Sequence, residues 1–363
     1  MLAAIQNTTL LDDVFLEDPT TMSLESHLAS LTAHPSALFV LSGTMGNQLA
    51  LRSHLTQPPH SILCDHRAHI LKWEAGGVAS LCGALVMGVV PRNGLHLTLE
   101  DIEEHVDLSD DVHVCPTRVI CLENTLHGTI MPLSEASRIS TFARSHGIKL
   151  HLDGARLWEA ATAGAGSLSD YASLFDSVSL CFTKGLGAPV GSILVGGKAF
   201  IQRARWIRKS IGGGIRQAGV VTAAARVAVD ETFGLGPTGE GGLLRRSHER
   251  ARLIAEKWLS RGGKLEKPVD TNMVWFDLNA LGITDEKFVD LGKDLGLKLL
   301  GGRVVVHYQI SDEAVARLEG LMDRVFEMAA GTTTTAAAAT ATATAATAGE
   351  KNAGEVRRKG YGT

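Results

Sequence analysis

Two stretches decide the fold of this chain: Ser177-Val-Ser-Leu-Cys-Phe-Thr-Lys-Gly-Leu-Gly-Ala-Pro-Val-Gly191 and the earlier Lys149-Leu-His-Leu-Asp-Gly-Ala-Arg156. Each starts as a short apolar strand and ends in a charged group, Lys184 in the first and Asp153 in the second. A lysine on a Thr-Lys-Gly turn is well placed to form a Schiff base, and an aspartate at the end of a neighbouring strand can hold a pyridinium nitrogen protonated. Pyridoxal phosphate chemistry requires these two groups, so the pair predicts a pyridoxal phosphate enzyme.

Each of the two residues also has an ordinary explanation when it is taken singly. A lysine before glycine is usually a solvated loop residue, and an Asp-Gly pair is usually a turn. The functional interpretation therefore depends on finding both groups, each at the end of an apolar strand.

Apolar strand-like runs alternate with helix-like runs from about residue 37 to residue 197. These runs are rich in Val, Ile and Leu without clean alternation, which is typical of strands buried on both faces. We therefore expect an α/β fold with a mostly parallel seven-stranded sheet and helices on both faces. The expected strands are 37–41, 61–65, 84–90, 117–123, 149–153, 177–183 and 192–196.

One helix can be placed in detail. Pro132 opens it, Ser134 is the expected cap, and Gly147 ends it. Its apolar face repeats at helical spacing through Ala136, Ile139, Phe142 and Ala143.

We expect three parts along the chain. Residues 1–231 form a large cofactor-binding domain, and residues 232–330 form a small α+β domain with strands at 272–277 and 303–308 and a closing helix at 312–328. The remainder, 331–363, begins with a run of Thr and Ala without apolar bulk, and we expect a disordered tail.

Composition excludes several classes of protein. The 363 residues are 45% hydrophobic and 20% charged, which is ample for a packed core. The net charge of −4 gives no sign of a nucleic-acid partner, and no apolar run is long enough to span a membrane. The five cysteines form no Cys-x-x-Cys, and the N-terminus has no signal-peptide pattern, so we expect reduced cysteines and a cytoplasmic enzyme.

A candidate phosphate site lies in Leu41-Ser-Gly-Thr-Met-Gly-Asn47, which follows a strand and opens a helix. Gly43 and Thr44 would place backbone N–H groups and a hydroxyl at the helix N-terminus, where phosphate binds well. Taken alone, the motif is better explained by an ordinary capped helix start. The spacing matches neither a Walker loop nor a dinucleotide fingerprint.

Histidines follow another strand end, in Asp65-His-Arg-Ala-His69. Either His66 or His69 could lie on a cofactor ring or move protons, although a loop histidine is the commoner reading. No second cluster with metal-ligand spacing is present in the sequence, so we expect no metal.

Three arginines are candidates for anion binding. Arg156 and Arg303 could clamp a substrate carboxylate in bidentate fashion, and Arg216 lies in the glycine cluster Gly212-Gly-Gly-Ile-Arg-Gln-Ala-Gly219. The alternative for each is a surface ion pair.

Taken together, these motifs resemble the low-specificity L-threonine aldolases, a pyridoxal phosphate family with the aspartate-aminotransferase-like fold, which implies fold type I. The match runs in order from about residue 12 to residue 326, and its Glu-Asn-Thr-Leu-His-Gly form is similar to the fungal branch. The matching motifs are Ser42-Gly-Thr-Met-Gly-Asn, Trp73-Glu-Ala-Gly-Gly, Leu122-Glu-Asn-Thr-Leu-His-Gly, Leu152-Asp-Gly-Ala-Arg, Thr183-Lys-Gly-Leu-Gly-Ala-Pro-Val-Gly-Ser, Gly212-Gly-Gly-Ile-Arg-Gln and Gly301-Gly-Arg.

The resemblance implies a role for each cofactor residue. Lys184 would form the Schiff base, Asp153 would pair with the pyridine nitrogen, and His69 would stack on the ring. Gly43 and Thr44 would hold the phosphate.

The same resemblance assigns the arginines and the assembly. Arg156 and Arg303 would bind the substrate carboxylate, and Arg216 would reach the phosphate region of a neighbouring subunit's site. Members of the family are usually dimers of dimers with shared sites.

Two departures from the family pattern stand out. Leu126 occupies the position after Glu-Asn-Thr where many relatives carry histidine, and His127 comes next. The family's Arg-Ser-Asp-Thr start is absent, and Asp13-Val-Phe-Leu-Glu-Asp18 replaces an Asp-Val-Tyr-Gly-Glu-Asp stretch. The resemblance thus allows a truncated or divergent copy with weakened activity.

The expected activity is that of a carbon–carbon lyase, cleaving L-threonine or L-allo-threonine to glycine and acetaldehyde. The catalytic base is His69 or a water held near it. Two alternatives stay open: an amino-acid (alanine) racemase on the same scaffold, and a non-catalytic paralogue.

Overall fold

The computed structural model describes the backbone of residues 1–347 and the side chains of residues 1–330. The chain divides into two compact units. The first unit comprises Met1–Ala255, Lys267–Val274 and Val305–Ile310, and the second comprises Glu256–Glu266, Trp275–Val304 and the chain from Ser311 onward. The boundary at 231/232 stays a prediction from sequence, whereas in the structure the first unit continues to Ala255.

The first unit is built on a seven-stranded sheet with the strand order β1-β7-β6-β5-β4-β2-β3. Strand β7 runs antiparallel to both of its neighbours, and the other neighbouring pairs are parallel. The predicted mostly parallel sheet is confirmed. The strands are β1 (Ser36–Val40), β2 (Ser61–Asp65), β3 (Leu85–Val89), β4 (Thr117–Glu123), β5 (Lys149–Asp153), β6 (Ser177–Cys181) and β7 (Ser192–Gly196).

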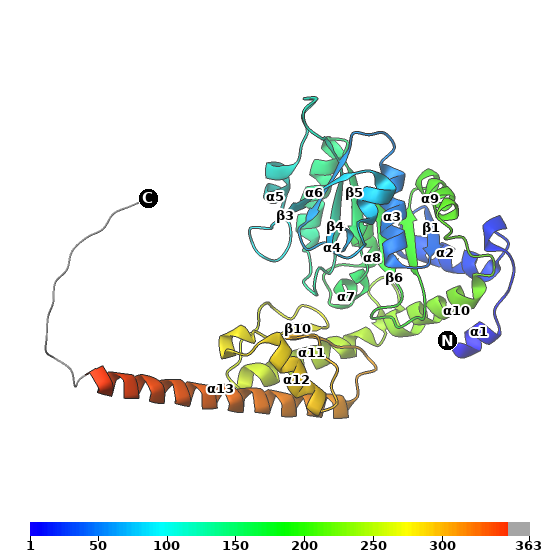
Figure 1. Ribbon diagram of the computed structural model, residues 1–363. Helices are drawn as coiled ribbons and strands as arrows, with labels where there is room; N and C mark the ends of the chain where they lie inside the picture. The colour runs from blue at the N-terminus through cyan, green and yellow to red at the C-terminus, as the bar shows by residue number, and fades with distance from the viewer. Residues whose placement is uncertain (348–363) are drawn as a thin grey trace. The chain divides into compact units, whose positions relative to one another are not determined.

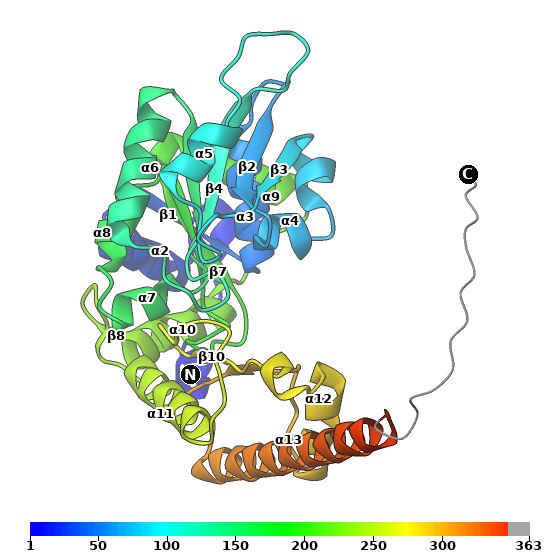
Figure 2. The same cartoon turned by 90° about the vertical axis from the view of Figure 1, so that its left-hand side faces the viewer.

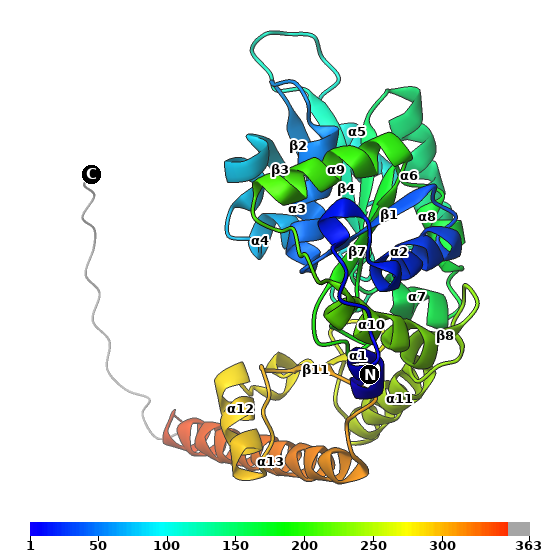
Figure 3. The same cartoon turned by 90° about the vertical axis from the view of Figure 1, so that its right-hand side faces the viewer.

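Helices cover both faces of this sheet (Figures 1, 2 and 3). In β1, Leu38 and Val40 pack into one apolar cluster while Ala37 and Phe39 pack into another, because successive side chains point to opposite faces. Both faces are therefore apolar, which explains the lack of alternation in the sequence. Helices α3 (Gly43–His54) and α9 (Lys198–Ser210) cover one face, and α2 (Pro19–Leu31), α6 (Leu133–Ser145) and α8 (Leu168–Ala172) cover the other.

Short elements complete the first unit. Its four-residue helix α4 carries a candidate site residue, and the others connect strands or extend the helix layers. They are α1 (Leu2–Gln6), η1 (Asp13–Phe15), α4 (His69–Lys72), η2 (Val78–Cys82), α5 (Leu99–His105), α7 (Leu157–Thr162), α10 (Gly219–Val227), η3 (Ala228–Phe233), β8 (Gly234–Leu235) and β9 (Glu240–Gly241), followed by α11 (Leu244–Ser260), which ends in the second unit.

The predicted cap of α6 is wrong. Pro132 is the N-cap residue, no side chain caps the helix, and Ser134 lies inside the first turn. Proline lacks an N–H and has a fixed φ, so it suits a helix start, where backbone N–H groups have no intrahelical partner. Gly147 ends the helix as predicted, with a left-handed φ of 66°.

The second unit has an aromatic core. The ring of Trp258 stacks on Phe276 with centroids 4.3 Å apart, and Phe276 meets Phe288 edge-on at 6.1 Å. The two predicted strands are present in shorter form and pair with each other. The helices of this unit are η4 (Asn279–Leu281), α12 (Asp285–Asp294) and α13 (Asp312–Thr347). Strands β10 (Met273–Trp275) and β11 (Arg303–Val305) each include a point where the chain passes from one unit to the other.

Helix α13 extends beyond the predicted end at residue 328. The backbone of 331–347, which we expected to be disordered, is helical, and the rest of the expected tail, 348–363, lies outside the described residues. No helix among the described residues is long and apolar enough to cross a membrane.

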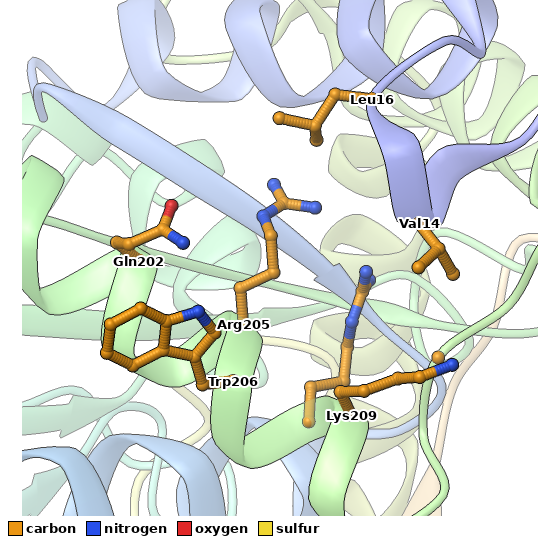
Figure 4. A pocket seen from close by; sticks show the side chains of 8 residues that line it. Val14, Leu16, Gln202, Arg205, Trp206 and Lys209 are labelled. Carbon is orange, nitrogen blue, oxygen red and sulfur yellow. The ribbon is translucent and has the colours of Figure 1, made fainter.

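Buried ion pairs tie the start of the chain to α9. The fully buried Asp13 accepts a hydrogen bond from Arg208 at 2.9 Å, and Arg208 also donates to the carbonyl of Phe39 at 2.6 Å. Arg205 pairs with Glu25 at 2.9 Å. Asp13 and Glu25 neutralise the two arginines. We therefore interpret the adjoining pocket of about 210 Å³ as part of the structural contact between these segments (Figure 4). Its lining residues are Val14, Leu16, Gln202, Arg205, Trp206, Arg208, Lys209 and Gly214.

Candidate active site

Helix α3 presents its N-terminus at the predicted phosphate motif. Ser42 is the N-cap residue, and its hydroxyl accepts the backbone N–H of Met45 at 3.1 Å. The first N–H groups of a helix have no intrahelical partner, which leaves those of Gly43 and Thr44 for an anion. The helix dipole adds a positive potential at the same point. The geometry fits a phosphate, and the assignment of Gly43 and Thr44 stays a prediction.

Asp153 and Lys184 follow neighbouring parallel strands. Asp153 is the last residue of β5, and its partner in the β5–β6 register is Ser179. Lys184 comes three residues after the end of β6, and its carbonyl accepts the N–H of Gly187 in a tight turn. Because the carboxyl ends of parallel strands meet at one edge of a sheet, both groups lie on the side where α/β proteins bind ligands.

The Asp153 carboxylate is buried and already hydrogen-bonded. One oxygen accepts the side-chain amide of Asn47 at 2.7 Å, and the other accepts the backbone N–H of Ala155 at 3.1 Å. These donors fix the orientation of the carboxylate at the end of the strand.

His69 begins α4 and is held from two sides. Its backbone N–H donates to Glu123 at 2.9 Å, and its Nδ1 lies 2.8 Å from Glu74 Oε1. The hydrogen bond to Glu74 raises the pKa of His69, against the effect of burial. The charge of Asp153 raises the same pKa further and that of Lys184 lowers it. Ligand atoms of His69 and Asp153 lie within 4.8 Å of each other.

The structure distinguishes between the two candidate histidines. His66 Nδ1 lies 3.3 Å from Asp65, in the turn after β2. His69 instead joins the cluster of Glu74, Asp153 and Lys184. Of the two, His69 is therefore the better candidate, and its catalytic role stays a prediction.

Glu123 adds an unusual acid to this cluster. Burial, together with the negative charge of Asp153, raises the pKa of Glu123 to about 8. The positive charges of Lys184 and His69 offset only part of this shift. At neutral pH, Glu123 therefore carries a proton and adds no negative charge beside Asp153.

One group among the described residues has a spacing that metal ions also use. The ligand atoms of His69, Glu74 and Asp153 lie within 4.8 Å of one another. Both carboxylates, however, already accept an N–H of Asn47, at 2.9 Å and 2.7 Å. The group is thus held together by hydrogen bonds, and the absence of a metal stays a prediction from sequence.

The three candidate arginines lie in different places. Arg156 is the N-cap residue of α7, directly after the Asp153 turn. Arg216 is exposed and pairs with Asp12 at 2.7 Å. Arg303 belongs to the second unit, where its guanidinium lies 5.7 Å from the ring of Trp275. Their roles in binding substrate or cofactor stay predictions.

Three residues of the cluster were missed as site residues in the sequence analysis. Asn47, Glu74 and Glu123 all lie inside the motifs quoted there. A signal was available for Glu123, which ends an apolar strand in the same way as Asp153 does. Asn47 gave no such signal, because its partner Asp153 is 106 residues away.

The donor set fits pyridoxal phosphate. A lysine amine and a carboxylate follow neighbouring strand ends, and an imidazole lies within reach of both charges. Such a set can bind an aldehyde, hold a ring nitrogen and cover a ring face.

Comparison with known proteins finds a matching family and several similar proteins. A family model for beta-eliminating lyases matches residues 1–280. The chain is 60% identical over 322 residues to the aldolase vrtJ of Penicillium aethiopicum, covering 89% of this chain and 81% of that protein. It is 48% identical over 312 residues to the low-specificity L-threonine aldolase of Candida albicans, covering 85% and 81%. It is also 47% identical over 318 residues to the alanine racemase TOXG of Cochliobolus carbonum, covering 88% and 82%.

Solved structures share the fold. A putative L-allo-threonine aldolase from Listeria monocytogenes superposes with a TM-score of 0.72 at 25% identity, covering 90% of this chain and 92% of that one. A serine palmitoyltransferase with pyridoxal phosphate superposes with a TM-score of 0.67 at 16% identity, covering 91% and 83%. The second likeness concerns the fold alone.

Proposed function

This chain belongs to the beta-eliminating lyase family, and on that premise we propose that it cleaves L-threonine and L-allo-threonine to glycine and acetaldehyde. It is a carbon–carbon lyase that uses pyridoxal 5'-phosphate. The observation that carries the proposal is the placement of Asp153 and Lys184 after neighbouring strands, within electrostatic reach of His69. Threonine aldolase relatives at this level of identity support the choice of reaction.

The cofactor residues have separate tasks in this proposal. Pyridoxal phosphate, when bound, supplies an electron-accepting ring for the charge left at the substrate α carbon. Lys184 would hold its aldehyde, Asp153 would keep its ring nitrogen protonated, and Gly43 and Thr44 would bind its phosphate. Arg156 and Arg303 would bind the substrate carboxylate.

His69 is the proposed base for the substrate hydroxyl. A carboxylate only accepts hydrogen bonds, so the contact with Glu74 makes Nδ1 the protonated nitrogen of the neutral ring. This leaves the lone pair of Nε2 free to take a proton. Glu74 therefore fixes both the tautomer and the orientation of the base.

Glu74→Gln is expected to move the acidic limb of the pH–rate profile to lower pH. Only neutral His69 can accept a proton, so the rate falls as pH drops below its pKa. The hydrogen bond to the Glu74 carboxylate is the main cause that raises this pKa, and the oxygen of an uncharged amide stabilises the protonated ring less. The profile of kcat/KM for L-threonine measures the shift, with the exposed Glu103→Gln as control. An unmoved limb would mean that His69 is not the base.

Arg156→Lys and Arg303→Lys are expected to raise the KM for threonine by about tenfold or more while cofactor affinity persists. Lysine keeps the charge but loses the planar fork, and a lost hydrogen bond to a charged group costs about 1.5–3 kcal/mol. Steady-state kinetics and pyridoxal phosphate titration separate the two effects. The surface pair residue Arg138 provides the control Arg138→Lys. A variant that loses cofactor instead would move its arginine to the phosphate.

One relative favours a second candidate reaction. The similarity to an alanine racemase makes loss and return of the α proton the alternative. Purified protein with pyridoxal phosphate is incubated with L-threonine and, separately, with L-alanine. Glycine with acetaldehyde supports the aldolase, D-alanine alone supports the racemase, and neither product supports a non-catalytic paralogue.

The same proposal covers assembly and location. We infer a homo-oligomer, a dimer of dimers with shared sites, in the cytoplasm, acting on small amino acids without a nucleic-acid partner. The exposed guanidinium of Arg216, which the family resemblance assigns to a neighbouring subunit, supports the shared site.

A further inference from the structure

A chain of buried polar side chains leads away from Asp153 through the first unit. Asn47 stands at its near end, on the second turn of α3, and its side-chain nitrogen donates one hydrogen to Asp153 and the other to Glu74. Asn47 is 1% exposed. The amide thus separates two buried acidic side chains that would otherwise face each other.

The two hydrogen bonds that the Asn47 nitrogen donates determine which atom is the donor in each remaining hydrogen bond. Since the Asn47 nitrogen donates to the carboxylates, its oxygen accepts, and His151 Nε2, 3.1 Å away, must be the donor. His151 Nδ1 is then an acceptor, so the hydroxyl of Ser177 donates to it at 2.8 Å. The oxygen of Ser177 in turn accepts from His54 Nε2 at 2.8 Å.

The two histidines of this hydrogen-bonded series, His151 and His54, are neutral at physiological pH. Burial lowers the pKa of His151 to about 4, and burial with the charge of His151 lowers that of His54 to about 3. Neutral rings allow the single direction of donation described above. An amide cannot pass a proton on, so this series of hydrogen bonds orients the Asp153 carboxylate and does not conduct protons to it.

We propose that Asn47 and His151 are positioning residues for Asp153, which keep its carboxylate anionic and aimed at the cofactor's ring nitrogen. His151 holds the Asn47 oxygen, Ser177 fixes the tautomer of His151, and Asn47 presents its two N–H groups to Asp153 and Glu74. Bonds arranged head to tail polarise one another, which strengthens the donation to the carboxylate. The inference rests on the proposed pairing of Asp153 with the ring nitrogen.

The test uses the protonation of the bound cofactor rather than turnover alone. The full chain is reconstituted with pyridoxal phosphate labelled with ¹⁵N at the ring nitrogen, and its chemical shift is recorded for wild type, Asn47→Asp and His151→Phe. His60→Phe is the matched control, because His60 is also a buried histidine at the sheet, but among the contacts described its ring bonds only to the carbonyl of Cys82.

Wild type and His60→Phe are expected to give the protonated shift. Asn47→Asp places a third acid against Asp153 and Glu74, and His151→Phe leaves the amide oxygen unheld, so both should move toward the unprotonated shift. We expect kcat for threonine to fall about tenfold in both, with KM within about twofold. Ser177→Ala, a smaller change, should give an intermediate shift and serves if Asn47→Asp fails to fold.

Two results would overturn the inference in distinguishable ways. In the first, His151→Phe, Ser177→Ala and any folded Asn47→Asp all give a protonated shift equal to that of His60→Phe. The buried polar side chains would then contribute to packing alone and would not position Asp153. An unprotonated shift in wild type would refute the pairing of Asp153 itself, and the inference with it.

Discussion

Lys184→Ala is expected to lower threonine cleavage by on the order of 10⁴-fold or more, the largest effect of any single substitution in this chain. The residue follows β6 at the ligand-binding edge of the sheet, and it is the amine that would hold the cofactor aldehyde. Alanine removes the nucleophile completely, and removal of a group of this kind costs several powers of ten.

Reduction with borohydride gives a readout that is independent of turnover. Treatment of the loaded protein should fix the cofactor mass on the peptide that contains Lys184, and the label should be absent from Lys184→Ala. The exposed Lys198 at the start of α9 provides the control Lys198→Ala, which should label as wild type does. Labelling that persists in Lys184→Ala would place the reactive amine elsewhere.

Asp153→Asn is expected to have the second largest effect, a loss of about 2 kcal/mol or more of transition-state stabilisation, or about thirtyfold in kcat. Asparagine keeps the shape of the side chain but removes the charge that stabilises a protonated ring nitrogen. The neighbouring Asn47 amide, which donates to Asp153 at 2.7 Å, would then face a group that is no longer an anion.

Measurement of kcat at saturating pyridoxal phosphate separates this effect from weaker cofactor binding. The exposed Asp290 of α12 provides the control Asp290→Asn. Turnover of Asp153→Asn equal to that of wild type would remove the argument for an electron sink stabilised by Asp153.

The sequence predicted the sheet well because its signals are local. Four strands, β2, β4, β5 and β7, have the predicted bounds, and the end of β5 carries Asp153 as predicted. Strand β6 ends at Cys181 instead of the predicted residue 183, so Lys184 lies in the turn after it. Apolar runs specify burial, and the carboxyl ends of parallel strands share an edge, so both steps follow without knowledge of distant contacts.

The polar network could not be predicted in the same way. Asn47 finds His151 at a separation of 104 residues and Asp153 at 106, and no local pattern specifies which buried polar groups will meet. The wrong cap at Ser134 has a different cause: a shift of two residues in the helix start moves the capping position onto Pro132.

The position of β1 has a consequence for the order in which the chain can assemble. β1 is an edge strand whose only partner in the sheet is β7, with Ser36 opposite Gly196. Strand β1 therefore cannot pair until about 160 further residues have been made, while its apolar side chains on both faces stay without their final cover. Contacts of such long sequence separation slow folding, because the entropy lost on closing the loop comes before the strands pair and stabilise the fold. The buried pair of Asp13 and Arg208 closes over 195 residues, so β1 and Asp13 acquire their native contacts late in synthesis.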